Sequence, residues 1–208
     1  MIINLMGRSL LVCAALLGLC ATGGAVAADT DKLVEGCANC HGKGGASTEF
    51  DVPIIGGFSA VYLSDRLNAY KNQETACPET KFRAGSKKGQ KSDMCKVAHD
   101  LSDADIKQIA QYFSKQKFVR AKQKFDPVLA KKGKEIHELN CEKCHSEGGT
   151  VAADDAGMTG GQWMPYLAEA LKQFESDKRP IAKKMKIKLE KLEKGDTEAL
   201  LNYYCSIK

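Results

Sequence analysis

The chain has 208 residues, of which 43% are hydrophobic and 27% are charged, and its formal net charge at pH 7 is +5. This length allows one or two domains. The small excess of lysine and arginine is shared between the two halves of the chain, so the composition argues against a nucleic-acid-binding protein.

The first 28 residues have the features of a secretory signal peptide. Arg8 precedes an apolar run from Leu10 to Thr22, and Ala25-Val26-Ala27 supplies the small residues of a cleavage site. The apolar run is shorter than the ~20 residues that a membrane-spanning helix needs. We therefore predict a periplasmic mature chain without a membrane span, in a compartment where disulfides persist.

The first half of the mature chain, residues 29–114, contains the sequence Cys37-Ala38-Asn39-Cys40-His41. Cys-x-x-Cys-His is the attachment signature of haem c. Two thiols at this spacing reach the two vinyl-derived carbons of one porphyrin, and the adjacent histidine places its imidazole on the iron. We predict Cys37 and Cys40 as covalent attachment points and His41 as an axial iron ligand.

Helical patterns follow this motif, and no convincing alternating strand pattern does. An amphipathic helix is predicted from Tyr62 to Tyr70, and a second helix begins at Ser102 with Asp105 completing a variant of the capping box. The second helix has one apolar face, formed by Ile106, Ile109, Ala110 and Phe113.

Met94 is the predicted second axial ligand of the first iron. It is the only methionine in this half, and a methionine ligand raises the reduction potential of a haem relative to a second histidine. His99, five residues later, is the alternative ligand.

Cys77 and Cys95 bracket a polar insertion of roughly residues 75–91. In an exported protein these two cysteines most simply form a disulfide that closes the loop and steadies Met94. Two alternatives stay open. The thiolates could hold copper together with His99 or a carboxylate, or Cys95 could itself bind the first iron.

Residues 115–130 are predicted to be a linker between two domains. They are rich in lysine and glutamine, and their polar part ends at Asp126-Pro127. The following domain, residues 131–208, contains the second motif, Cys141-Glu142-Lys143-Cys144-His145. Cys141 and Cys144 are accordingly predicted to attach a second haem c, with His145 on its iron.

Met185 is the predicted methionine ligand of the second iron, because it follows an amphipathic helix predicted from Tyr166 to Phe174. Met158 and Met164 lie nearer the motif and are assigned to packing. His137 is interpreted as an ordinary polar residue that faces the proximal side of its own haem or the solvent. The last helix is predicted to begin near Asp196.

Features other than the haem motifs also recur at an offset of 104 residues. Gly56-Gly57 recur as Gly160-Gly161, and Tyr62-Leu63 recur as Tyr166-Leu167. A repeat of this length indicates duplicated domains. The arrangement resembles the soluble dihaem cytochromes built from two tandem class I cytochrome c domains, which implies an all-α fold.

The second half also resembles the cytochrome subunit of flavocytochrome c sulfide dehydrogenase. The resemblance lies in residues 116–126, Lys143-Cys144-His145, Glu147-Gly148-Gly149, Gly161-Gln162-Trp163, Pro165-Tyr166-Leu167, Arg179-Pro180, Lys183-Lys184-Met185 and Lys188-Leu189. It implies a non-catalytic electron-transfer subunit that takes electrons from a FAD-binding sulfide dehydrogenase subunit and passes them to a soluble cytochrome c. Cys77, Cys95 and the insertion depart from this family's pattern.

The chain has no Gly-rich dinucleotide fingerprint, so FAD would lie on the partner. Two other functions stay open. One is a free-standing dihaem carrier that serves a terminal oxidase. The other is a dihaem enzyme of the peroxidase or thiosulfate-oxidising type, with an open or thiolate-ligated iron.

Overall fold

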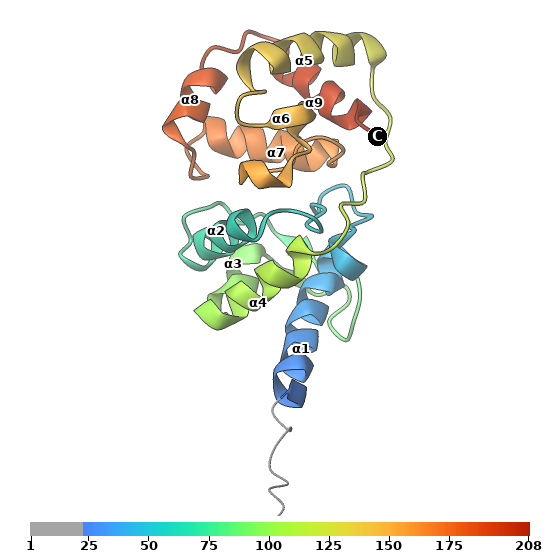
Figure 1. Cartoon of the computed structure of the whole chain (residues 1–208), viewed down its shortest axis with the longest axis vertical. Helices are drawn as coiled ribbons and strands as arrows, with labels where there is room; N and C mark the ends of the chain where they lie inside the picture. The colour runs from blue at the N-terminus through green and yellow to red at the C-terminus, as the bar shows by residue number, and fades with distance from the viewer. Residues whose placement is uncertain (1–22) are drawn as a thin grey trace, which may run out of the picture.

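The computed structural model describes residues 23–208, which form two helical units stacked along the long axis of the molecule (Figure 1). The predicted signal peptide lies mostly outside these residues. Its cleavage region falls in the first turns of helix α1, which begins at Gly23. Within residues 23–208 no helix combines the length and the apolar character needed to cross a membrane.

The first unit consists of helices and one short antiparallel hairpin. Its elements are α1 (Gly23–His41), η1 (Lys43–Gly45), α2 (Ala60–Lys71), β1 (Thr80–Lys81), β2 (Lys91–Ser92), α3 (Met94–His99) and α4 (Asp103–Ser114). The second unit is helical throughout, and its elements are α5 (Pro127–Asn140), α6 (Ser146–Gly149), η2 (Ala152–Asp154), α7 (Met164–Glu175), α8 (Lys183–Leu189) and α9 (Asp196–Ser206).

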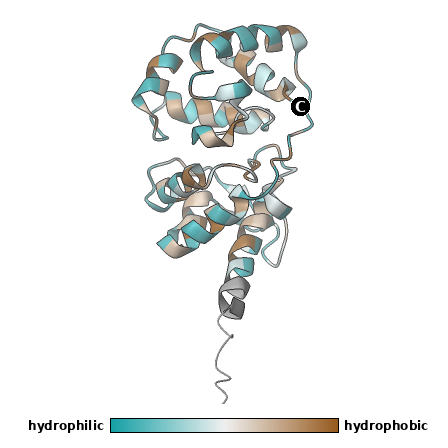
Figure 2. Ribbon diagram, in the orientation of Figure 1, coloured by the Kyte–Doolittle hydropathy of each residue, from teal (hydrophilic) through white to brown (hydrophobic). Residues whose placement is uncertain are grey.

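The core of the first unit lies between α2 and α4. The predicted capping box is present, because Ser102 accepts from the Asp105 backbone N–H while the Asp105 carboxylate accepts from the Ser102 backbone N–H. The predicted apolar face of α4 is buried, with Phe113 completely inaccessible to solvent. The all-α fold predicted from the sequence is confirmed, and hydrophilic residues lie along outer helices such as α5 and α8 (Figure 2).

The core of the second unit is built where α5 crosses α9. At this crossing a side chain on Gly133 would collide with the backbone of Ala199, so only glycine permits the two helices to approach so closely. Leu200 and Tyr204 of α9 are buried against Leu167 of α7.

The connection between the units is shorter than the predicted linker. Asp126 is the N-cap of α5 and accepts from the backbone N–H groups of Val128 and Leu129, and Pro127 occupies the first turn. Proline fits that position because its missing N–H would have no partner there. Residues 127–130, assigned to the linker from composition, therefore belong to the helix.

The two units are joined by hydrogen bonds and by apolar packing. Gln162 is fully buried, and its side-chain amide accepts from the Ile54 N–H (3.0 Å) and donates to the Ile54 carbonyl (2.9 Å). The indole N–H of Trp163 donates to the Ser47 carbonyl at 3.1 Å. Met158 packs into the core of the first unit, so its packing role extends across the interface.

Candidate cofactor and metal centres

The first Cys-x-x-Cys-His motif opens into a cavity of about 780 Å³. Cys37, Cys40, His41 and Met94 all line this cavity, although Met94 is far from the other three in sequence. Its volume lies within the range of ~300–1,000 Å³ that is usual for small-molecule and cofactor sites. The structure thus gathers the four residues that the sequence assigns to the first iron and its porphyrin.

The orientation of His41 leaves one ring nitrogen available to a metal. The side chain is buried, and its Nδ1 lies 2.8 Å from the carbonyl oxygen of Pro53. Since a carbonyl can only accept, Nδ1 carries the proton and the lone pair is on Nε2. Burial lowers the pKa of His41, which keeps the imidazole neutral at pH 7.

His145 has the same arrangement in the second unit. Its Nδ1 lies 3.2 Å from the carbonyl oxygen of Gly157, which stands 12 residues after His145 as Pro53 does after His41. Burial also lowers the pKa of His145. A backbone carbonyl that fixes the tautomer and the ring orientation is a usual support for a metal-binding histidine.

Three of the four motif thiols have raised pKa values and so are not poised to act as free thiolates. Burial raises the pKa of Cys37 to about 12, and burial also raises the pKa values of Cys40 and Cys141. Since the thiolate is the form that binds metals and attacks disulfides, these thiols suit neither role at neutral pH. This chemistry fits covalent attachment of a porphyrin better than a redox dithiol.

Met94 is the first residue of α3, which Asp93 caps by accepting from the Lys96 N–H at 2.9 Å. The next residue, Cys95, forms a disulfide with Cys77 (S–S 1.95 Å). Neither sulfur is therefore a thiolate available to copper or to the first iron in this structure.

His99 does not share the cavity with Met94. Its side chain is exposed, and its Nδ1 pairs with the carboxylate of Asp100 at 2.7 Å. The structure therefore favours Met94 over His99 as the ligand facing His41.

Met185 is half-buried in α8 and does not line the cavity of the first unit. Its helix lies next to the second motif, because the Nζ of Lys188 donates to the Asn140 side chain, directly before Cys141, at 3.3 Å. The assignment of Met185 to the second iron stays a prediction.

His137 does not face the solvent, which was one of the two orientations expected from the sequence. It is completely buried, with Nδ1 3.0 Å from the Tyr204 hydroxyl and Nε2 2.7 Å from the Glu142 carboxylate. Glu142 lies inside the second motif and also accepts from the backbone N–H of Glu147 at 2.8 Å. His137 therefore links Tyr204 of α9 to Glu142 and helps to hold the second motif in position.

Two arginines outside the Cys-x-x-Cys-His motifs also line the cavity of the first unit. Arg66 comes from α2 and Arg179 from the second unit, where it is only 4% exposed. The Nε atoms of both are buried without a hydrogen-bond partner, and neither guanidinium forms an ion pair with a described carboxylate.

Buried cations without a counter-charge are costly, so this cavity favours an anionic guest. The guanidinium of Arg179 donates to the Tyr166 hydroxyl at 3.4 Å. Burial raises the pKa of Tyr62 to about 12 and also raises the pKa of Tyr70, so these two phenols stay neutral and do not neutralise the arginines. A haem, with its two propionate carboxylates, fits a cavity that combines these cations with Cys37, Cys40 and His41.

Comparison with known proteins gives relatives along most of the chain. The pattern of the cytochrome c family matches residues 27–117. A cytochrome c4 from Stutzerimonas stutzeri is 32% identical over 209 residues, covering 94% of this chain and 95% of the relative. The cytochrome c4 of Pseudomonas aeruginosa is 28% identical and covers 94% of each chain.

A similar fold is found in the crystal structure of reduced recombinant cytochrome c4 from Pseudomonas stutzeri. It superposes with a TM-score of 0.69 at 29% identity, covering 89% of this chain and all of the other.

Proposed function

Because this chain belongs to the cytochrome c4 family of dihaem c-type cytochromes, we propose that it is a periplasmic electron carrier with one haem c in each unit. The observation that carries the proposal is the repeated histidine geometry. In both motifs a histidine Nδ1 faces a backbone carbonyl twelve residues later, which leaves Nε2 for an iron. The cavity that joins the first motif to Met94 supports the proposal that His41 and Met94 would both bind the first iron.

A haem c iron supplies reversible one-electron chemistry between the ferrous and ferric states. The chain controls that chemistry through its own residues. His41 and Met94 would hold the iron in the first unit, and we assign His145 and Met185 to the same roles in the second. An iron held by a histidine and a methionine would leave no site for a substrate, which favours a carrier over a peroxidase-type enzyme.

The attachment roles can be tested by counting haems. Wild-type protein, matured in a host that attaches haem c, should contain two haems per chain by the pyridine haemochrome assay. The pairs Cys37→Ser/Cys40→Ser and Cys141→Ser/Cys144→Ser should each retain one. A wild-type content of one haem per chain would contradict attachment at one of the two motifs, and the pair of variants that then loses all haem would identify the occupied one.

A second candidate is more specific, namely the cytochrome subunit of a sulfide dehydrogenase with a FAD-binding partner and a soluble cytochrome c acceptor. It is favoured by the resemblance in residues 116–126 and around Cys144-His145. The full-length similarity to cytochrome c4, in contrast, favours a free-standing carrier.

The two candidates differ in what accompanies the chain. Purification from the native periplasm should yield a flavin-containing subunit in stoichiometric amount if the second candidate is right. A monomer on gel filtration without flavin absorbance supports the free-standing carrier.

A further inference from the structure

The insertion in the first unit covers the outer side of the first haem motif. Its hairpin segment, residues 79–92, docks on Asn39, whose carbonyl accepts from the backbone N–H groups of Arg83 (2.8 Å) and Ala84 (3.0 Å). The contact is so close that a side chain on Gly85 would lie 2.5 Å from the Asn39 side chain. The Cys40 thiol points to the Lys81 carbonyl at 3.8 Å.

The second unit has no counterpart of this cover. Only residues 176–182 separate α7 from α8, and Lys143 and Cys144, which correspond to Asn39 and Cys40, are both exposed. A porphyrin attached to Cys144 would therefore lie close to the surface, whereas one attached to Cys40 would lie beneath the hairpin segment.

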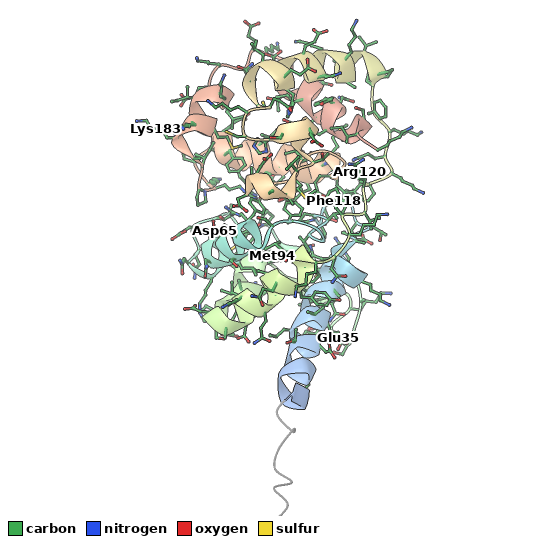
Figure 3. The ribbon with its side chains drawn as sticks, viewed as in Figure 1. Glu35, Asp65, Met94, Phe118, Arg120 and Lys183 are labelled. Atoms are coloured by element: carbon green, nitrogen blue, oxygen red, sulfur yellow. A yellow bond between two sulfur atoms is a disulfide. The ribbon has the colours of Figure 1, made fainter. Side chains whose placement is uncertain are left out.

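The helices that carry the two candidate methionine ligands also differ in charge, because α8 has unpaired lysines and α3 has none. Helix α8 carries four lysines and no acidic residue, and only Lys186 is ion-paired, with Asp177 at 2.6 Å. Lys183 and Lys184 are exposed, and Lys183 projects from the outer edge of the second unit (Figure 3). In α3, by contrast, the one lysine, Lys96, pairs with Asp93 at 3.0 Å.

The two helices α5 and α8 also carry exposed apolar side chains near this site. Leu139 at the end of α5 is 79% exposed, and Ile187 in α8 is 43% exposed. The hydrogen bond between Lys188 and Asn140 holds the two helix ends together. An apolar centre with a charged rim is the usual anatomy of a protein–protein contact, and weak redox encounters use small versions of it.

We propose that redox partners dock on the second unit, over a surface formed by Leu139, Lys143, Ile187 and the lysines of α8, which we call the α8 surface. The fitting partner is a redox protein with a small apolar patch inside an acidic rim. This inference rests on the proposed electron-carrier function. In each encounter one electron leaves the partner's reduced centre and one ferric iron of this chain becomes ferrous, without bond making or proton transfer.

The test compares two adjacent lysine pairs with equal charge changes. Lys183→Glu/Lys184→Glu alters the α8 surface, and Lys87→Glu/Lys88→Glu alters the exposed tip of the hairpin segment. The probe is a reduced plant-type [2Fe–2S] ferredoxin, an acidic protein, mixed with the oxidised holoprotein in a stopped-flow instrument. At low ionic strength the first variant should react at least tenfold more slowly, whereas the hairpin variant should stay within twofold of wild type.

The difference should shrink as salt is added, because screening weakens attraction between exposed charges. An equal loss in both variants would mean that only net charge matters, and a larger loss in the hairpin variant would place docking on the first unit. Either result overturns the inference. Failure of the proposed function is distinguishable, since such a protein would lack two haems or would not be reduced by dithionite.

A third variant tests the apolar centre. Leu139→Glu should slow the ferredoxin reaction even at high salt, while the haem content and thermal unfolding stay unchanged because the side chain is largely exposed. An unaltered rate at high salt would remove Leu139 from the surface and overturn the apolar part of the inference.

Discussion

Arg66 and Arg179 show how single residues can define a cofactor site without belonging to its motif. Arg66 donates to the Thr75 hydroxyl at 2.5 Å and lies over the Tyr70 ring, while Arg179 lies over the Phe174 ring, 5.2 Å from its centre. These contacts hold both guanidiniums in place but do not neutralise them. A positive charge fixed beside a haem disfavours the ferric state, which is the more positive of the two iron states, and so raises the reduction potential.

Replacing Arg179 should therefore lower one of the two reduction potentials. We expect Arg179→Gln to lower this potential by about 60 mV, which corresponds to a tenfold change in the equilibrium constant of a one-electron couple. The other potential should move by less than half as much, because Arg179 lines the cavity of the first unit. Spectroelectrochemical titration measures both. Arg120→Gln, at an exposed position on the linker (Figure 3), is the control, and an equal shift there would contradict a specific role.

The two methionines can be separated by their effect on ferric absorption. Bonding of methionine to ferric haem iron gives a weak long-wavelength band, to which each iron should contribute about half. Met94→Ala and Met185→Ala should therefore each remove about half of the band, and the double variant should remove all of it. Met158→Ala is the control, because Met158 packs in the core of the first unit. A full-strength band in Met94→Ala would contradict the assignment at the first iron.

At the scale of elements, local chemistry made part of the structure predictable. Ser102 and Asp105 predict the start of α4 because a capping box involves only neighbouring residues. The hairpin segment was not predictable in the same way. Strands of two residues carry no alternation, and the contact of Arg83 with Asn39 joins distant parts of the chain. Arg179 was missed as a site residue for the same reason, since it reaches the first cavity from the other unit.

The disulfide between Cys77 and Cys95 should stabilise the segment that carries Met94. Closing a loop of this size restricts the unfolded chain and contributes about 3 kcal/mol. We expect Cys77→Ser/Cys95→Ser to unfold at a lower temperature, with loss of the long-wavelength band of the first iron before that of the second. Differential scanning calorimetry with parallel absorption spectra measures both.

Dithiothreitol provides the control for this prediction. The reductant should lower the unfolding temperature of wild type towards that of the double variant and should leave the variant unchanged. A similar effect of the reductant on both proteins would show that it acts elsewhere than at the Cys77–Cys95 bond.

At the scale of the whole molecule, the two units form a shared structure. The Ala76 N–H donates to the Lys178 carbonyl at 2.8 Å, and a side chain on Gly157 would lie 2.8 Å from the Tyr62 hydroxyl. Tyr166 and Arg179 of the second unit complete the cavity of the first. A carrier built in this way holds its two sites at a fixed separation, and loss of the interface would alter both stability and the surroundings of the first site.

Gln162 is the residue on which this coupling can be tested. Gln162→Leu preserves most of the volume but leaves the Ile54 N–H and C=O buried without partners, at a cost of about 1–3 kcal/mol for each group. Wild type should unfold in one calorimetric transition, because the interface couples the units. The variant should unfold in two, with the first unit melting earlier. Gln111→Leu, at an exposed position of α4, should behave as wild type. A single transition at the wild-type temperature in Gln162→Leu would show that the units are coupled through other contacts, with Trp163 and Met158 the next to replace.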